Sequence, residues 1–387
     1  MDWTKYIPQY GQEIEKMAAF WLKFSIDSSF GGYFCVISAK GEITDTDKYV
    51  LWHGQQAYTF AKLYQQITPR PEWLEYAKNG ADFLLQFASD SKGNWYATTD
   101  RMGHLVQVAT DVQPEAFAAA AWGMLARVLT EEIYAETARK TLQKAFKKRD
   151  KMLLKWTEDP TGPRHLKNLN EWTALATALL ACQETVSEKF LKEKAALLLT
   201  ELTTHFWEPR ADILLTNVPA WGGYWECEKG RSLQPGAAFE ALSAGLDLAR
   251  LLKKNKISKQ LARQVQYIAQ TTWDEKYGGF FQALDLKSLP LPNTTASHKL
   301  AEVQLNALVA LQKAESVLND HELFKLWQRT HDYLWQHFPD RSVVGEWVGV
   351  LNRHGEPLLE LKATSHKCAY QTVAKIIDLT SANTREV

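Results

Sequence analysis

The sequence predicts an all-α fold, a closed (α/α) barrel of six helical hairpins (about twelve helices) forming a single domain over residues 1–387. Apolar residues recur at the helical spacing i, i+3, i+4 and i+7 over most of the chain. The helical stretches also alternate between small-faced, wholly apolar ones and ordinary amphipathic ones. An inner ring of buried helices wrapped by an outer ring accounts for this alternation.

The predicted helices are separated by clear breaks. The segments ITPRP, EDPTGP and FPDRS each contain a proline, which ends or opens a helix. In chain order, helices are expected at about 8–25, 48–67, 71–88, 113–129, 131–153, 169–185, 187–206, 234–253, 257–273, 296–315, 320–338 and 366–381.

The inner helices are identified by their small residues. PEAFAAAAWGMLARVL (114–129), EWTALATALLAC (171–182) and GAAFEALSAGLDLARLL (236–252) lack a broad polar face. A helix that is apolar on all sides is buried on all sides, and Ala and Gly let its neighbours approach closely. The amphipathic stretch EEIYAETARKTLQKAFKKRDKML is typical of the outer ring.

The links between hairpins contain a repeated phrase. DSSFGGYF at 27–34 is nearly copied by DEKYGGFF at 274–281, and NVPAWGGYWECEKG is comparable. Gly-Gly permits positive φ, and the flanking aromatics can form short paired strands. Because each link joins an outer helix to the next inner one, the links and their short β-hairpins should gather at one end of the barrel. They would line the mouth of a pocket there.

The composition excludes several classes of protein. Lys plus Arg and Asp plus Glu both number 45, so no basic field favours nucleic acid. No apolar run is long enough to span a membrane, and the N-terminus lacks the layout of a signal peptide. The four cysteines have no close spacing, which favours a reducing cytoplasm. No phosphate-binding loop or metal-ligand spacing is present, so neither cofactor nor metal is expected.

Three segments carry a resemblance to a known family. MAAFWLKFSIDSSFGGYF, GEITDTDKYVLWHGQQAY and GEWVGVLNRHGEPLLELKATSHKCAY resemble the N-acylglucosamine 2-epimerase superfamily, over about residues 10–375. The resemblance implies a barrel of six helical hairpins and a small carbohydrate as ligand. It also implies proton transfer at sugar C2, which requires a base, an acid and a donor for the enediolate oxygen. It leaves a homodimer open, because dimers are common in the family.

Three family motifs have changed residues here. The motif Pro-Gly-His-x-x-Glu falls on QPGAAFEA, with Ala237 at the histidine and Glu240 retained. The motif that ends in the second histidine falls on KCAYQ, with Gln371 at that place. Gly-Arg-Gln falls on HGQQAY, with Gln55 in place of the arginine.

The fourth motif, Lys-Leu-Trp-Trp-Pro-His-Ser-Glu in the family, falls on KLAEVQLN. Ala301 and Glu302 replace its tryptophans, and Gln304 and Asn306 replace its His and Glu. Ala, Gln and Asn do not titrate near neutral pH. The resemblance therefore implies the fold of the family without its usual acid, base and cationic side chain.

The candidate catalytic residues are Glu240 and His53. Candidate substrate-binding residues are Trp52, Gln55, Glu115, Glu171, Ala237, Gln304, Asn306, Trp347 and Gln371. Carboxylates on apolar inner helices are unusual unless paired or functional. For these glutamates the alternative is a structural network with residues such as Lys48 or Arg164. His366 is expected to point away from Gln371.

Three functions remain open on the sequence. The first is the family reaction, epimerisation or isomerisation at sugar C2. The second is a non-catalytic relative that binds a carbohydrate or a protein partner. The third is a changed enzyme that uses Glu240 on a bulkier, less polar substrate.

Overall fold

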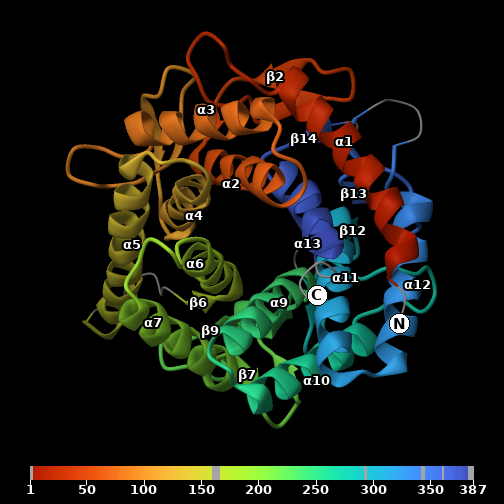
Figure 1. The fold of residues 1–387 in the computed structure, drawn as a ribbon. Helices are drawn as coiled ribbons and strands as arrows, with labels where there is room; N and C mark the ends of the chain where they lie inside the picture. Colours follow the sequence, from red (N-terminus) through yellow and green to blue (C-terminus); the bar gives the residue numbers. More distant parts are fainter. Residues whose placement is uncertain (1–2, 159–165, 292–293, 341–344, 360, 382–387) are drawn as a thin grey trace.

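The computed structural model describes residues 3–158, 166–291, 294–340, 345–359 and 361–381, and its helices form two concentric rings (Figure 1). The outer helices are α1 (Ile7–Phe24), α3 (Pro71–Phe87), α5 (Glu132–Glu158), α7 (Glu188–Thr200), α10 (Asn255–Thr271) and α12 (His321–His337). The inner helices are α2 (Val50–Gln66), α4 (Gln113–Val128), α6 (Leu169–Ala181), α9 (Pro235–Leu251), α11 (Ala301–Leu318) and α13 (Lys375–Ser381). The predicted alternation of outer and inner helices is confirmed.

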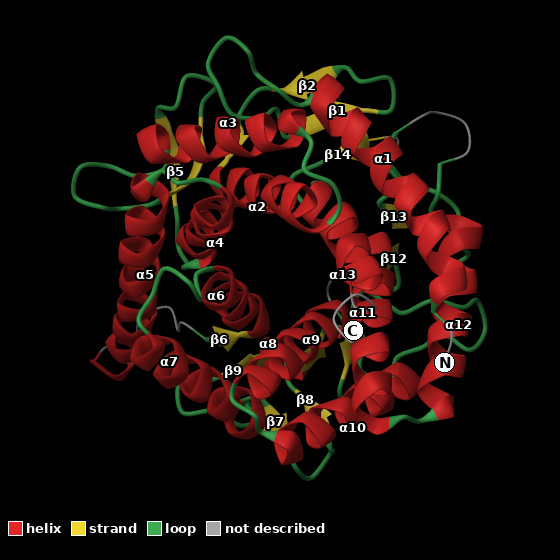
Figure 2. Cartoon of the chain, viewed as in Figure 1, coloured by secondary structure: helices red, strands yellow, loops and turns green. Residues whose placement is uncertain are grey.

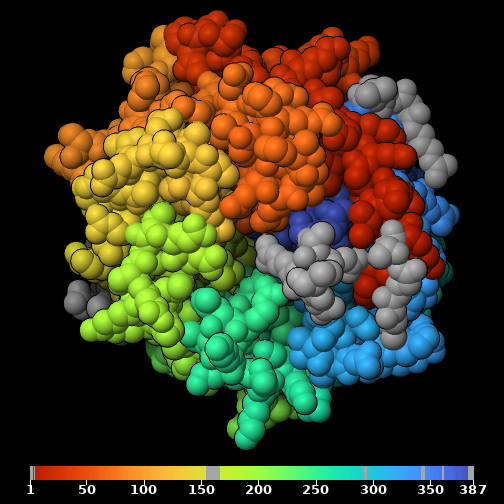
Figure 3. Space-filling model, in the orientation of Figure 1, coloured from red at the N-terminus to blue at the C-terminus, as the bar shows by residue number. Residues whose placement is uncertain are grey.

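The inner ring is closed. Consecutive inner helices pack on one another, and α13 packs against both α11 and α2. A three-stranded sheet joins the two ends of the chain, with β1 (Val36–Ser38) between β14 (Leu361–Ala363) and β2 (Ile43–Asp45). In the space-filling view the C-terminal helices accordingly lie against the N-terminal segment (Figure 3).

Short antiparallel strands fill the links between outer and inner helices (Figure 2). They pair as β3 (Lys48–Tyr49), β4 (Tyr96–Thr99) and β5 (Leu105–Val108); β6 (Lys167–Asn168) with β9 (Asn217–Val218); β7 (Trp207–Glu208) with β8 (Ile213–Leu214); β10 (Ser232–Leu233) with β11 (Leu284–Asp285); and β12 (Lys299–Leu300) with β13 (Val350–Leu351). The aromatic residue that follows each Gly-Gly pair forms a single β-bridge: Tyr33 pairs with Ile26, and Phe280 pairs with Trp273.

Several short elements depart from the predicted helices. The helix expected at 366–381 begins as a π-helical turn, η3 (Tyr370–Ala374), before α13. A second π-helical turn, η2 (Glu201–His205), follows α7. A 3₁₀ turn, η1 (Thr4–Tyr6), precedes α1, and α8 (Glu228–Arg231) lies in the link before α9.

Glycine permits the close packing expected of the inner helices. A Cβ on Gly54 of α2 would lie 2.7 Å from the main-chain carbonyl carbon of Phe117 in α4. A Cβ on Gly123 of α4 would lie 2.7 Å from the sulfur of Cys182, just after α6. Both distances are shorter than real Cβ contacts, so these positions require glycine.

The repeated phrase builds the same ion-paired loop twice. In the first copy Asp27 begins the loop, and its buried carboxylate lies 3.2 Å from Nζ of Lys48. Arg101 donates to the same carboxylate at 2.9 Å. Gly31 and Gly32, with φ of 73° and 69°, turn the chain back so that Asp27 N–H bonds to the carbonyl of Gly32.

The second copy uses equivalent residues. The carboxylate of Asp274 lies 3.2 Å from Nζ of Lys299 and accepts from Arg353 at 2.8 Å. Gly278 and Gly279 again have positive φ, 78° and 73°. Lys48 and Lys299 stand immediately before inner helices α2 and α11. The phrase recurs because each copy fixes the start of an inner helix.

Candidate functional site

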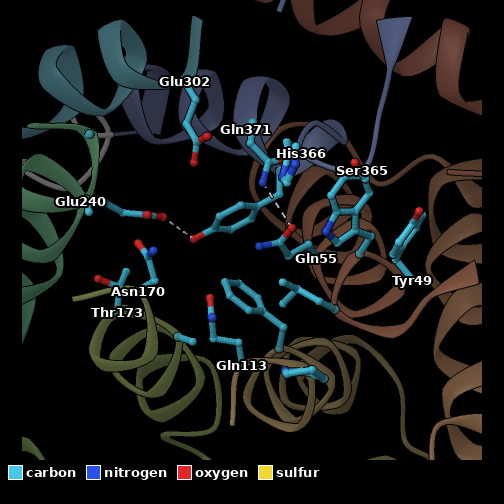
Figure 4. Close-up of a pocket in the computed structure, with 18 of the residues that line it drawn as sticks. Tyr49, Gln55, Gln113, Asn170, Thr173, Glu240, Glu302, Ser365, His366 and Gln371 are labelled. Atoms are coloured by element: carbon cyan, nitrogen blue, oxygen red, sulfur yellow. Dashed lines mark hydrogen bonds between the residues drawn. The ribbon is translucent and has the colours of Figure 1, made fainter. Parts of the chain in front are cut away.

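A pocket of about 500 Å³ opens on the barrel axis, at the end where the links gather. Residues from inner helices α2, α4, α6, α9 and α11 and from η3 line it, together with residues of the β4–β5 hairpin. Figure 4 shows the polar side chains around its walls. The predicted pocket at this end of the barrel is present.

Glu240 is held firmly in the wall. It lies in α9, where its Oε1 atom accepts a hydrogen bond from the Tyr370 hydroxyl at 2.7 Å and an ion-paired hydrogen bond from Lys375. The Lys375 ammonium also lies 4.1 Å from the centre of the Tyr370 ring. The other oxygen, Oε2, accepts no hydrogen bond within the described chain, so it is free to accept one from a ligand.

Glu302 faces the same pocket from the first turn of α11 (Figure 4). It makes no hydrogen bond or ion pair with any described residue. Burial raises the pKa of its carboxyl group to about 7, and the negative charge of Glu240 adds to this effect while Lys375 opposes it. Glu302 can therefore both give and accept a proton near neutral pH.

Gln371 and Gln55 form a fixed amide pair. Oε1 of Gln371 accepts from the N–H of Cys368 at 2.8 Å, and Nε2 of Gln371 donates to Oε1 of Gln55 at 3.2 Å. The thiol of Cys368 reaches the same oxygen of Gln55 at 3.5 Å. Because its oxygen is occupied, Gln55 has its NH₂ group left as a neutral donor for the pocket.

The remaining walls combine amides with aromatic rings. The side chains of Gln107, Asn170, Gln234 and Gln282 line the pocket and make no hydrogen bond with other described residues. Trp52, Tyr49 and Phe117 add aromatic surface, which stacks well on the C–H faces of sugars. Unpaired amides beside aromatic faces suit a ligand with many hydroxyl groups.

A smaller chamber of about 50 Å³ adjoins the pocket. Leu300, Val350, Leu359 and Leu361 give it a mainly apolar wall. Glu302, His366 and Gln371 line both the chamber and the axial pocket, so they stand at the boundary between the two.

The structure brings together five of the predicted site residues in the pocket lining: Trp52, Gln55, Ala237, Glu240 and Gln371.

His53 lies outside the pocket lining, contrary to its predicted catalytic place. Its side chain is fully buried, and Nε2 accepts the N–H of Tyr33 at 2.8 Å. Nδ1 must then carry the proton that it donates to the carbonyl of Tyr49 at 2.9 Å. Burial lowers the pKa of His53 to about 3. Both ring nitrogens are bonded to main-chain groups, so the role of His53 is structural.

Glu115 and Glu171 also lie outside the pocket lining. Glu115 is ion-paired with Lys148 at 2.6 Å, and Glu171 accepts from the side chain of Asn168 at 3.0 Å. Of the structural partners predicted for the glutamates, Lys48 instead pairs with Asp27, and Arg164 lies outside the described residues.

Three further candidates bond elsewhere. The amide of Gln304 bonds to both main-chain groups of Phe280. Nδ2 of Asn306 donates to the carbonyl of Gly236 at 3.2 Å. The indole of Trp347 is fully buried and donates to Glu13 at 2.7 Å, and Trp347 is not part of the pocket lining.

Sequence reasoning missed Glu302, Tyr370 and His366 as pocket residues. Glu302 is a carboxylate near the start of an inner helix, the same signal that singles out Glu240, but the family motif marks its position only as a replaced tryptophan. The expectation that His366 points away from Gln371 was wrong: His366 precedes η3 in a turn rather than lying on a helix, and it lines the pocket together with Gln371.

Two other features bear on the class of protein. Within the described residues, no group of three or more His, Cys, Asp or Glu side chains is placed to hold a metal ion. No helix in the described part of the chain has the length and apolar character needed to cross a membrane.

Comparison with known proteins agrees with this architecture. The N-acylglucosamine 2-epimerase of Bos taurus is 28% identical over 377 residues, covering 92% of this chain and 86% of that protein. The cellobiose 2-epimerase of Bacillus thermoamylovorans B4167 superposes with a TM-score of 0.81 at 17% identity, covering 98% of this chain and 99% of that chain. A D-mannose isomerase gives a TM-score of 0.83 at 17% identity and 98% coverage of both chains.

The sequence model of the N-acylglucosamine 2-epimerase (GlcNAc 2-epimerase) family matches residues 31–371, which is most of the chain. Together with the (α/α) barrel and its axial pocket, this match establishes that the chain belongs to the N-acylglucosamine 2-epimerase family.

Proposed function

We propose that the protein binds a carbohydrate in the axial pocket and transfers a proton at the carbon beside the sugar carbonyl, with Glu302 as the base. The observation that carries this proposal is the state of Glu302. It is an unpaired carboxyl group, open to the pocket, whose pKa of about 7 matches neutral conditions. General bases work best when their pKa lies near the operating pH.

The neighbouring groups suit the other requirements of this chemistry. When Glu302 removes the C2 proton of an open-chain aldose, the electron pair forms a C1–C2 double bond and negative charge develops on the carbonyl oxygen. The free NH₂ group of Gln55 can donate to that oxygen. Oε2 of Glu240 can accept from a sugar hydroxyl and so fix the substrate.

One base favours aldose–ketose isomerisation over epimerisation. After proton removal, Glu302 returns the proton to C1 on the same face, while the O2 hydroxyl proton passes to O1, and a ketose results. Epimerisation at C2 also needs an acid on the opposite face of the intermediate. We assign the proton transfer to Glu302 alone, so for sugars with an O2 hydroxyl we expect isomerisation to predominate.

The open pocket argues against a purely structural role. A non-catalytic relative bound to a protein partner would not need unpaired amides around an axial cavity. A relative that binds a sugar without reacting with it has the same walls, and only the behaviour of Glu302 separates that alternative from catalysis.

The test is proton NMR of the purified protein in D₂O with glucose, mannose, fructose, cellobiose, N-acetylglucosamine and N-acetylmannosamine. We expect deuterium at C1 or C2 of at least one sugar, and a loss of at least 100-fold in Glu302→Gln. Glu322→Gln, which removes an exposed carboxylate from α12, is the matched control. Binding without exchange would show a sugar-binding protein, and full activity in Glu302→Gln would refute the assigned base.

A further inference from the structure

The axial pocket is lined by three carboxyl groups and one imidazole, that of His366, but by no Lys or Arg side chain of the described residues. Asp111, Glu240 and Glu302 all contribute to its walls, whereas no Lys or Arg does so among the described residues. Lys375 stands behind Glu240, is only 5% exposed, and is not part of the lining. Its ammonium is already ion-paired.

Two of the three carboxyl groups have no cation as a partner. The carboxylate of Asp111 accepts from the N–H of Gln113 at 2.8 Å and from its side-chain amide at 3.2 Å, both neutral donors. Lys148, which reaches the main-chain oxygen of Asp111, is ion-paired with Glu115. Glu302 has no partner within the described chain. Asp111 and Glu302 are only partly exposed, and half-buried carboxylates without a cation are less favourable than paired ones unless something else compensates their charge.

We propose that the ligand supplies this compensation, and that the substrate is an amino sugar with a free, positively charged amino group. This inference rests on the proposed function, because it names the class of sugar for the same pocket. A 2-amino sugar has no O2 hydroxyl, so with it we expect Glu302 to exchange the C2 proton without forming a ketose. An ammonium group donates charge-assisted hydrogen bonds to carboxylates, which are stronger than those of a neutral amide. A phosphate or a sugar acid would meet three carboxyl groups and no Lys or Arg, so the pocket disfavours such ligands.

The same arrangement discriminates against neutral analogues. A hydroxyl at the position of the amine carries no charge, and an N-acetyl group offers one neutral N–H. The apolar side chamber beyond Glu302 could receive the methyl of an N-acetyl group, which makes N-acetylglucosamine the decisive competitor. The charge argument predicts that the free amine binds more tightly despite that chamber.

The experiment is isothermal titration calorimetry at pH 7 and low salt with glucosamine, N-acetylglucosamine, glucose and glucosamine 6-phosphate. We expect glucosamine to bind at least tenfold more tightly than the two neutral sugars, and the phosphorylated sugar to bind more weakly than glucosamine. The preference should shrink at higher salt, because salt screens charge interactions.

Variants test which groups are responsible. Asp111→Asn and Glu302→Gln should each reduce the ratio of glucosamine affinity to glucose affinity by about threefold or more. Glu322→Gln on the outer surface should leave the preference unchanged.

The outcomes separate this inference from the proposed reaction. Equal or tighter binding of N-acetylglucosamine overturns the amino-sugar inference, even if deuterium exchange on neutral sugars supports the reaction. Preferential glucosamine binding without deuterium exchange at C2 of glucosamine, measured alongside the neutral sugars, supports the inference and refutes the reaction. If none of the four sugars binds, the inference is refuted.

Discussion

His53 and Gln304 accept the same kind of hydrogen bond at equivalent places in the two halves of the barrel. Nε2 of His53 accepts the N–H of Tyr33 at 2.8 Å, and Oε1 of Gln304 accepts the N–H of Phe280 at 2.9 Å. Tyr33 and Phe280 each follow a Gly-Gly turn. An imidazole in one copy and an amide in the other thus hold the repeated loop against its inner helix.

This equivalence predicts that glutamine can replace His53. We expect His53→Gln to change the free energy of unfolding by less than about 1 kcal/mol, because the amide can accept from Tyr33. His53→Ala should cost about 2–4 kcal/mol, because it leaves a buried N–H unpaired and creates a cavity. Urea unfolding of both variants checks this, and equal losses would show that the hydrogen bond is unimportant. Any sugar activity should survive in His53→Gln.

The buried imidazole also makes stability depend on pH. Since burial lowers the pKa of His53 to about 3, the unfolded chain binds a proton at this residue below pH 6.5 while the folded chain does not. Stability is therefore lost as the pH falls from about 6.5 toward 3. Between pH 6.5 and 5 the loss should be about 2 kcal/mol at 1.36 kcal/mol per pKa unit. Other groups titrate alike in both proteins. If the free energy of unfolding of His53→Gln falls with pH as steeply as that of the unchanged protein, His53 is not the source of this pH dependence.

Glu302 should produce the opposite dependence on pH. Its carboxyl pKa is raised from an ordinary 4.5 to about 7, so the folded chain holds a proton there that the unfolded chain has lost. Stability should fall as the pH rises from about 4.5 to 7 and stay reduced above that. We expect Glu302→Gln to be more stable by about 3 kcal/mol at pH 8 and nearly unchanged at pH 4. Thermal unfolding at both pH values measures this, with Glu322→Gln as the control. An equal change in stability at pH 8 and at pH 4 would rule out titration of Glu302 as the cause.

The two loop aspartates should be among the costliest polar residues to replace. Burial alone would raise the pKa of Asp274, but Arg353 and Lys299 outweigh it and hold the pKa below its usual range. Asp274→Asn leaves the buried Lys299 without its counter-charge, so we expect a loss of about 3–5 kcal/mol. Asp27→Asn should behave alike because Lys48 is equally buried. Glu193→Gln, at an exposed pair, should change the free energy of unfolding by less than about 0.5 kcal/mol in the same denaturant titration.

Gly54 offers a test of the close packing of the inner ring. In a free helix Gly→Ala would be stabilising by about 1 kcal/mol. At Gly54 the new Cβ would lie 2.7 Å from the main-chain carbon of Phe117, so we expect a net loss of about 1–3 kcal/mol. Gly11 in α1 has no atom within 4 Å of such a Cβ, and Gly11→Ala should be stabilising by up to about 1 kcal/mol. A gain at both positions would show that the inner helices can separate without cost.

The sequence by itself determined the barrel and its order of helices. Helical periodicity and the small residues of stretches such as 114–129 and 236–252 are local properties, and they separate inner from outer helices without knowledge of the contacts. The Gly-Gly phrase likewise marked the repeated links, although the ion pairs that explain the repetition join residues such as Asp27 and Arg101, which lie 74 positions apart.

Only the tertiary structure decided which polar residues face the pocket. His53 and Gln55 lie two positions apart on α2, yet one bonds to a link outside and the other reaches the axis, because successive residues of a helix point in different directions. Glu115 and Glu302 both sit in the first turn of an inner helix, but Glu115 meets Lys148 and Glu302 meets no cation. The pKa of a carboxyl group follows from such surroundings, and long-range packing supplies them.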